Sequence, residues 1–318
     1  MTSLCAVISG IGHALPETVV TNHDLAARLD TTDEWIRTRS GIRERRIAPP
    51  EMGTADLAVE AGAQALKSAA VDAVDLVVLA TSTPDRACPA TAPAVMSRLG
   101  LGRVPAFDID AVCSGFLYGL ATSVAMVTSG QFGTILLIAA DTFSRLVDPE
   151  DRATAFLFGD GAGAVVLRRG GPDEHGAVLT VSIGSDGTQE ELITVPDAQS
   201  HFTMQGQAVY RQAVVTMADS ASRTMADVGW TVEDVDWFVG HQANQRILDA
   251  VANRIGVAPD RAISNVAHVG NTAAASIPLA LSEAASAGRL RPGDRVVLAA
   301  FGGGATWGAA ALTWPRLG

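Results

Sequence analysis

Residues 107–120 read FDIDAVCSGFLYGL. A largely apolar run ends at Cys113, a Ser-Gly pair follows, and apolar residues then recur at helical spacing as far as a closing Gly130. This pattern predicts a strand followed at once by a helix, with Cys113 at the start of that helix. Because a helix N-terminus favours an anion, we expect this thiol to ionise more readily than a free cysteine. On this stretch alone, a buried cysteine that only fills the core is the alternative.

The composition limits the class of protein. Its 318 residues exceed the usual size of one domain, which predicts two domains or one large two-lobed domain. Hydrophobic residues make up 48% of the chain, with 31 glycines and few aromatics, as is typical of α/β proteins with tight turns. The formal net charge of −11 argues against general nucleic-acid binding. An acidic partner would therefore need a local basic patch.

The distribution of apolar residues and cysteines bears on the compartment. No apolar run reaches the roughly 18 residues that a membrane span needs, and the first ten residues lack the basic start of a signal peptide. Cys5, Cys88 and Cys113 are odd in number and scattered, which fits neither a disulfide framework nor a zinc site. We therefore expect a cytoplasmic protein with no membrane partner and no bound metal.

The second half of the chain repeats the first. DLVVLAT at 75–81 is echoed by DWFVGH at 236–241, and FGDGAGAVVL at 158–167 resembles FGGGATWGAAAL at 301–312. Self-similarity at so long a period indicates a duplicated domain. We therefore predict two halves, residues 1–170 and 171–318. Each should be an α/β unit with helices on the faces of a sheet, and the two should pack about a pseudo-twofold axis with a site between them.

This repeat selects the polar residues of the shared site. His241 follows a predicted buried strand, at the end where α/β proteins bind ligands. Asn271 precedes the helix of the second half that matches the Cys113 helix. A cysteine, a histidine and an asparagine at element ends that face one crevice favour nucleophilic catalysis over three separate structural roles. The glycines at 302–304 could aim a backbone N–H at an oxyanion, although a tight turn also explains them.

A tryptophan among five arginines, between residues 31 and 46, is unusual in so acidic a chain. One interpretation is a solvated helix face. The other is a clamp in which Trp35 stacks on a base and the arginines hold phosphates, which suits a nucleotide-bearing cofactor. The residues alone leave both interpretations open.

Taken together, these motifs resemble those of the type III β-ketoacyl-acyl-carrier-protein synthases, which have the thiolase fold. The matching segments are AVCSGF at 111–116, FGDGAG at 158–163, GHQAN at 240–244, GNT at 270–272 and FGGG at 301–304. They occur in the family's order and spacing, and the resemblance covers essentially the whole chain. It implies a five-layered αβαβα architecture, a homodimer, an acyl-CoA primer and a malonyl-acyl-carrier-protein extender, with no metal or redox cofactor.

The resemblance also implies a role for individual residues. Cys113 would take the acyl group as a thioester, with its own N–H and that of Gly303 forming the oxyanion hole. His241 and Asn271 would stabilise the enolate that forms as the malonyl group loses carbon dioxide, and the resulting carbanion would attack the acyl-Cys113 thioester. The family's coenzyme A site falls here on Trp35, Arg39, Arg152, Gln207 and Asn244.

Two further sites follow from the resemblance. The expected acyl pocket comprises Cys88, Leu157, Phe158 and Met204. At the position of Cys88, acetyl-specific members commonly carry a bulky aromatic that crosses the dimer interface, so a smaller side chain would leave room for a longer, branched or cyclic primer. The acidic carrier protein needs cations at the tunnel mouth, for which the candidates are Arg211, Arg246 and Arg254.

Three other functions remain open at this point. A type III relative could move an acyl group to an alcohol or amine without condensation, although such relatives often alter the histidine-asparagine pair that is present here. The order Cys, His, Asn also describes a papain-like protease, whose local signature around the cysteine is absent. A silent partner subunit would not need every catalytic position.

Overall fold

The computed structural model describes residues 4–197 and 199–318. Residues 1–3, which belong to the stretch on which the signal-peptide expectation rests, lie outside this part. The first half contains β1 (Cys5–Ala14), β2 (Val19–Thr21), α1 (Asn22–Ala26), α2 (Asp33–Ser40), β3 (Glu44–Arg46), α3 (Thr54–Ser68), β4 (Leu76–Ala80), α4 (Ala92–Arg98), β5 (Ala106–Ile109), the 3-10 turn η1 (Val112–Ser114), α5 (Gly115–Thr128), β6 (Thr134–Asp141), η2 (Phe143–Leu146) and β7 (Gly161–Gly170).

The second half repeats this alternation of strands and helices. It contains β8 (Ala177–Ser185), η3 (Gly187–Leu192), β9 (Ile193–Thr194), β10 (Thr203–Met204), α6 (Gly206–Asp227), η4 (Val232–Asp234), β11 (Trp237–Gly240), α7 (Gln245–Ile255), η5 (Pro259–Arg261), α8 (Val266–Val269), η6 (Ala273–Ala275), α9 (Ser276–Ser286), β12 (Arg295–Gly302) and β13 (Thr306–Thr313). Within the described residues, none of these helices combines the length and the apolar character that crossing a membrane requires.

The strand pairings of the two halves match. In the described chain the main sheet has the order β11-β12-β13-β8-β1-β7-β6-β4-β5. β1 and β8 meet in its middle, where Ala6 pairs with Val178 and Val7 with Ala177. Outward from this junction, each half has two antiparallel pairings followed by a parallel one: β1–β7–β6–β4 on one side and β8–β13–β12–β11 on the other. Beyond them the halves differ, because β5 extends the first sheet whereas a single bridge, Phe238 with Ala262, takes its place beside β11.

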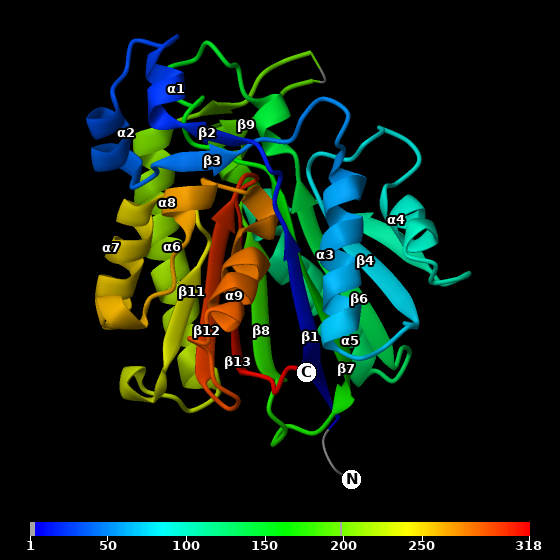
Figure 1. Ribbon diagram of the computed structural model, residues 1–318. Coiled ribbons are helices and arrows are strands. Elements are labelled where there is room, and N and C mark those ends of the chain that lie inside the picture. Colours follow the sequence, from blue (N-terminus) through cyan, green and yellow to red (C-terminus); the bar gives the residue numbers. More distant parts are fainter. Residues whose placement is uncertain (1–3, 198) are drawn as a thin grey trace.

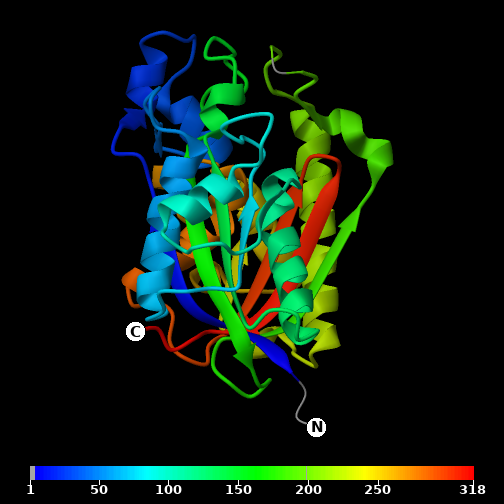
Figure 2. The same ribbon diagram turned by 90° about the vertical axis from the view of Figure 1, so that its right-hand side faces the viewer.

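Helices cover the outer faces of the sheet and fill the space between its two halves. α3 and α4 pack on one outer face, and α6 and α7 on the other. α5 and α9 lie between them, in a core that they share with strands of both halves. Figures 1 and 2 show this arrangement from two sides. The predicted five-layered αβαβα architecture is confirmed.

Glycine permits the close approach of α9 to the sheet. A Cβ atom at Gly163 of β7 would lie 2.6 Å from the backbone nitrogen of Leu279 in α9, which is closer than real Cβ atoms come. The helix that carries part of the candidate site is therefore seated directly on a strand of the first half.

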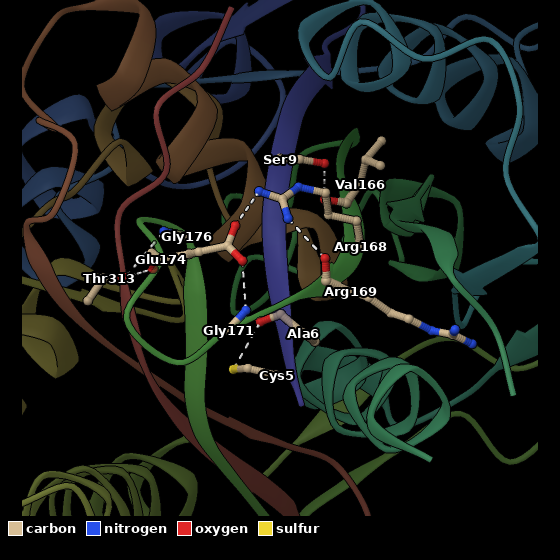
Figure 3. A network of polar contacts seen from close by, with 10 residues as sticks. All are labelled: Cys5, Ala6, Ser9, Val166, Arg168, Arg169, Gly171, Glu174, Gly176 and Thr313. Carbon is tan, nitrogen blue, oxygen red and sulfur yellow. Dashed lines mark hydrogen bonds and ion pairs between the residues drawn. The ribbon is translucent and has the colours of Figure 1, made fainter. Parts of the chain in front are cut away.

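The connection between β7 and β8 crosses the boundary that we expect between the halves. Figure 3 shows its polar contacts, which centre on Glu174. The carboxylate of Glu174 accepts hydrogen bonds from Arg168 and from the N–H of Gly171, both at 2.7 Å, and its carbonyl oxygen accepts one from the Thr313 hydroxyl at 3.2 Å. These bonds tie the connection to the end of β13, at the edge of the molecule opposite to the candidate site.

Candidate active site

Cys113 lies in the 3-10 turn between β5 and α5, as the sequence predicts. The residue before it, Val112, has a φ of 47°, which is rare for a β-branched side chain. Its N–H donates to Asp110 Oδ1 at 3.1 Å, which caps the turn. Backbone strain of this kind is typical of functional sites. The Cys113 side chain itself is 8% exposed.

The second half contains the matching turn. Ala273 has a φ of 48°, and its N–H donates to Asn271 Oδ1 at 2.9 Å. Asn271 thus occupies the place that Asp110 takes in the first half. Because Oδ1 is engaged by the backbone, the Nδ2 amino group is the part of the Asn271 amide that can donate to a substrate.

His241 follows β11 and is fully buried. Its Nδ1 lies 2.7 Å from Ser276 Oγ, and the same oxygen accepts the N–H of Gln242 at 3.3 Å. In the tautomer in which the Ser276 hydroxyl donates to Nδ1, Nε2 carries the proton of a neutral ring. Burial lowers the pKa of His241 to about 3, so the ring stays neutral. Nε2 is buried and has no hydrogen-bond partner among the described residues.

A single cavity of about 50 Å³ brings the three predicted catalytic residues together. Cys113, His241 and Asn271 supply its polar lining, and its other walls are largely apolar. Phe158 and Met204, predicted for the acyl pocket, both line it. The cavity therefore joins a thiol, an imidazole and a carboxamide within largely apolar walls.

The ionisation of the thiol differs from the expectation drawn from the sequence. Burial, followed by the negative charge of Asp141, raises the pKa of Cys113 to about 12. The expectation of a readily ionised thiol is therefore wrong for this closed cavity, because the low polarity around the sulfur outweighs its place at the start of a helix. Asp141 is not among the residues that the sequence predicts for the site. The signal that could have found it is its position in the repeat, at the end of the strand that matches 295–302.

The end of β12 lies directly against the Cys113 turn. A Cβ atom at Gly302 would be 2.9 Å from the backbone nitrogen of Cys113 and 3.0 Å from that of Ser114. Thr306 joins the same turn, since its hydroxyl donates to Ala111 O at 3.1 Å and its carbonyl accepts from the Ser114 hydroxyl at 3.1 Å. Gly303, predicted for the oxyanion hole, is buried between these contacts. Glycine at 302 thus keeps the space in front of the Cys113 N–H open.

Three of the residues predicted for coenzyme A form one cluster at the outer end of the molecule. The guanidinium carbons of Arg39 and Arg152 lie 4.6 and 4.9 Å from the centroid of the Trp35 ring. Arg39 and Arg152 are exposed, and Arg152 is 3.6 Å from the Asp30 carboxylate. The cluster can present an aromatic face and two cations to a nucleotide.

Not all five arginines around Trp35 belong to this cluster. Arg45 is 1% exposed and donates to the carbonyl oxygens of Val20 and Phe156 and to the side chain of Asn22. Arg45 therefore lies neither on a solvated helix face nor in a position to contact a phosphate. In the short strand β3, the Arg45 side chain points inward and binds the backbone of the segment that precedes Phe158.

The other two residues predicted for coenzyme A lie at helix starts. Asn244 caps α7 by accepting the N–H of Arg246 at 2.9 Å, and its Nδ2 donates to Arg39 O at 3.0 Å. It thereby ties α7 to α2. Gln207 is exposed in the first turn of α6.

The remaining acyl-pocket residues lie outside the cavity lining that the structure describes. Leu157 is buried beside it, and its carbonyl oxygen accepts the N–H of Asn271 at 2.9 Å. Leu157 therefore holds the Asn271 backbone. Cys88 is exposed on the loop before α4, away from the cavity of its own chain.

The three docking arginines are exposed on α6 and α7. Arg246 lies over the ring of Tyr210 at 5.6 Å, next to Arg211 in the chain. Arg254 is eight residues further along α7, about 12 Å at the usual helical rise, and it pairs with Asp219 at 3.4 Å. Arg211 and Arg246 thus share one end of the helix layer, whereas Arg254 lies apart. Among the residues described, no group of three or more His, Cys, Asp or Glu side chains is arranged to hold a metal ion.

Comparison with known proteins places this site in a family. Residues 107–187 match the family 3-oxoacyl-[acyl-carrier-protein (ACP)] synthase III, and residues 225–314 match the C-terminal part of the same synthases. Beta-ketoacyl-[acyl-carrier-protein] synthase III 2 of Streptomyces coelicolor is 58% identical over 97% of this chain and 94% of its own length.

Solved structures agree with these sequence matches. The crystal structure of 3-oxoacyl-(acyl carrier protein) synthase III from Pseudomonas aeruginosa has a TM-score of 0.96 and 50% identity, and covers 99% of both chains. The priming β-ketosynthase of the R1128 polyketide biosynthetic pathway has a TM-score of 0.92 and 34% identity, over 98% of this chain and 97% of that one. This chain belongs to the β-ketoacyl-[acyl-carrier-protein] synthase III family.

Proposed function

We propose that this protein condenses an acyl-CoA primer with malonyl-acyl-carrier protein to give 3-oxoacyl-carrier protein, coenzyme A and carbon dioxide. The observation that carries the proposal is the shared cavity of Cys113, His241 and Asn271, in which His241 Nε2 is buried without a partner among the described residues and Asn271 Oδ1 is already bound to the backbone. The names of the relatives, which are synthases that act with a carrier protein, support the same reaction.

The first half-reaction is acyl transfer to Cys113. The sulfur attacks the thioester carbonyl of acyl-CoA, and the N–H groups of Cys113 and Gly303 stabilise the oxyanion of the tetrahedral intermediate. The bond to coenzyme A then breaks, and the departing thiolate takes up the proton that Cys113 has lost. Trp35, Arg39 and Arg152 hold the nucleotide during this step, while Asn244 and Gln207 flank the pantetheine arm.

The second half-reaction needs donors rather than a base. The thioester carbonyl of the malonyl group accepts hydrogen bonds from His241 Nε2 and Asn271 Nδ2. When the carboxylate leaves as carbon dioxide, its electron pair forms an enolate whose oxygen these two groups stabilise. The enolate carbon attacks the acyl-Cys113 carbonyl, and the Cys113 sulfur leaves as a thiolate that takes up a proton from water to restore the thiol. A neutral imidazole suits this role, because it donates without giving up its proton.

Further features of the proposal concern the assembly and its setting. We expect the halves 1–170 and 171–318 to be duplicated units, and the protein to be a cytoplasmic homodimer in which Cys88 lines the acyl pocket of the partner and leaves room for a larger primer. Arg211 and Arg246, with Arg254 at the margin, are the docking residues for the carrier protein. The product would start fatty-acid or polyketide chains.

The test is the intact mass of the protein after incubation with a panel of acyl-CoAs, before and after addition of malonyl-carrier protein. We expect a mass gain on Cys113 that disappears as 3-oxoacyl-carrier protein forms. Cys113→Ser should lose acylation, while His241→Ala should keep acylation and lose decarboxylation. Acylation without a condensed product in the parent would support a non-condensing acyltransferase instead, and condensation by His241→Ala at near the parent rate would contradict the role of His241.

A further inference from the structure

Asp141 is a wholly buried carboxylate between the two halves, with no part in the steps described above. It ends β6. One carboxylate oxygen accepts hydrogen bonds from the first half: the N–H of Ser82 at 2.9 Å and the hydroxyls of Thr81 and Thr83 at 3.2 and 3.0 Å. The other accepts the N–H of Ala274, in the second half, at 3.0 Å. The carboxylate therefore bridges the halves.

Asp141 and Gly302 occupy matching places in the repeat. Each is the last residue of an eight-residue strand, and each pairs with the first residue of the next strand, Gly161 or Thr306. Gly302 faces the turn that holds Cys113, and Asp141 faces the turn that holds Ala274. At the catalytic turn, glycine leaves the backbone N–H uncovered. At the matching turn, a carboxylate of the protein itself covers that N–H.

The covered turn is the one that carries Asn271. Its first N–H, that of Ala273, binds Asn271 Oδ1, and the next, that of Ala274, binds Asp141. Ala273 is held at a φ of 48° between these bonds, a conformation that an alanine rarely adopts. Without the bond from Ala274 to Asp141, the backbone at Ala273 can relax to a more common conformation. The relaxation would change the direction of the Asn271 amide.

We propose that Asp141 is a positioning residue of the condensation step, which acts through the Ala274 N–H to aim Asn271 Nδ2 at the malonyl thioester. This inference rests on the proposed function. A residue that only stabilised the fold would affect both half-reactions. The proposed role instead predicts that Asp141 affects the condensation and not the acylation of Cys113.

The test uses Asp141→Asn, which keeps the shape of the side chain. One carboxamide oxygen can accept from the Ser82 side or from Ala274, but not from both. Since the loss of one oxyanion donor costs about 10²–10³ in rate, we expect malonyl decarboxylation to fall at least about tenfold, with acylation of Cys113 by acyl-CoA no slower than in the parent. Thr81→Val is the matched control: it removes a donor to the same carboxylate without touching Ala274, and should leave the ratio of the two rates unchanged.

A double-mutant cycle with Asn271→Ala decides whether Asp141 acts through Asn271. If it does, the double variant should decarboxylate less than about twofold more slowly than Asn271→Ala alone, because the amide that Asp141 positions is already absent. The inference would be overturned if the rate losses of the two single variants multiplied in the double variant. It would also be overturned if Asp141→Asn slowed acylation and decarboxylation equally. If Asp141→Asn fails to fold, the same cycle is run with Asp141→Ser. A parent that acylates but never condenses overturns the proposed function as well, whereas a condensing parent with an unaffected Asp141→Asn overturns this inference alone.

Discussion

Ser276 is the hydrogen-bond partner of His241 Nδ1, although it lies outside the cavity lining. Its oxygen accepts the Gln242 N–H, and when its own proton goes to Nδ1, Nε2 is the protonated nitrogen. Asn271 is oriented in the same way, by the Ala273 N–H that its oxygen accepts. At the scale of single residues, the donors of the site therefore depend on hydrogen bonds made on the side that faces away from the substrate.

Ser276→Ala should weaken condensation without touching acylation. The variant frees Nδ1 to take the proton, after which Nε2 presents a lone pair to the malonyl carbonyl. We expect the decarboxylation rate to fall roughly a hundredfold, as for the loss of one oxyanion donor, and the mass gain from acyl-CoA to remain. Ser286→Ala, at the far end of α9, is the control. A Ser276→Ala protein that decarboxylates malonyl-carrier protein as fast as the Ser286→Ala protein would show that Ser276 does not set the tautomer.

His241 should also make the folded state sensitive to acid. Burial lowers its pKa to about 3 from 6.5, so below pH 6.5 the unfolded chain binds a proton that the folded chain does not. This contribution to the free energy of unfolding is fully present above pH 6.5 and is lost as the pH falls towards 3, by about 2 kcal/mol between pH 6.5 and 5. Burial raises the pKa of Asp141 to about 7, so that group contributes in the opposite direction.

The effect of His241 is isolated by comparing the parent with His241→Gln, because both retain Asp141. Urea unfolding at pH 7 and pH 5, at one protein concentration, should show a smaller loss of stability in the variant. Equal losses in the two proteins would mean that His241 is protonated in the folded state.

At the scale of elements, the candidate site is built from the ends of helices and strands that the sequence separates widely. α2 is capped at its N-terminus by Thr32, whose hydroxyl accepts the N–H of Trp35 at 3.1 Å, and at its C-terminus by Gly41, which has a φ of 79°. Asn244 joins this helix to α7 through the Arg39 carbonyl. Trp35 is thus held by a short helix that is capped at both ends and tied to α7.

Trp35→Ala should separate the nucleotide from the reacting thioester. We expect KM for acyl-CoA to rise about tenfold, since base stacking on an aromatic ring is worth about 1–3 kcal/mol. KM for an acyl-pantetheine thioester, which lacks the nucleotide, should not change. Arg223→Ala removes an exposed arginine elsewhere on α6 and serves as the control. An equal rise for both thioesters would place Trp35 on the pantetheine arm instead.

At the scale of the whole molecule, one edge of the main sheet ends at β5, whose residues are all half-buried in the single chain. Exposed sheet edges are usually covered or paired, which suits a second copy of this chain at β5. The loop that carries Cys88 precedes α4, which packs next to β5, so the same contact would bring Cys88 of one copy towards the other.

The corresponding prediction combines mass and primer choice. Light scattering should give about twice the 32.9 kDa of one chain. Cys88→Phe should reduce acylation by long or branched acyl-CoAs relative to acetyl-CoA, because a larger side chain would fill the partner's acyl pocket. A monomer, or a dimer whose primer preference is the same in the parent and in Cys88→Phe, would contradict the proposed role of Cys88.

Several features could be predicted from the sequence because their signals are local. Hydrophobic periodicity predicted the strand-helix alternation, and the self-similarity of the two halves predicted that the segments of Cys113 and Asn271 match. The motif FGDGAG at 158–163 is not the counterpart of FGGG at 301–304, because FGDGAG leads into β7, whereas FGGG ends β12, the counterpart of β6. Arg45 could not be assigned in this way, because its neighbours in the chain are exposed or half-buried and only the packing of β3 against Phe156 turns it inward.

The order of elements and the places of Cys113, His241 and Asn271 beside them were thus determined by the sequence by itself, and the layered architecture followed from its resemblance to a known family. The tertiary structure decided their ionisation and direction: the high pKa of Cys113, the neutral ring of His241 and the aim of Asn271. The physical reason is that these properties depend on burial and on partners such as Asp141 for Ala274, 133 positions apart. The pattern of residues along a short stretch does not predict such contacts, because they form only when the two halves pack together.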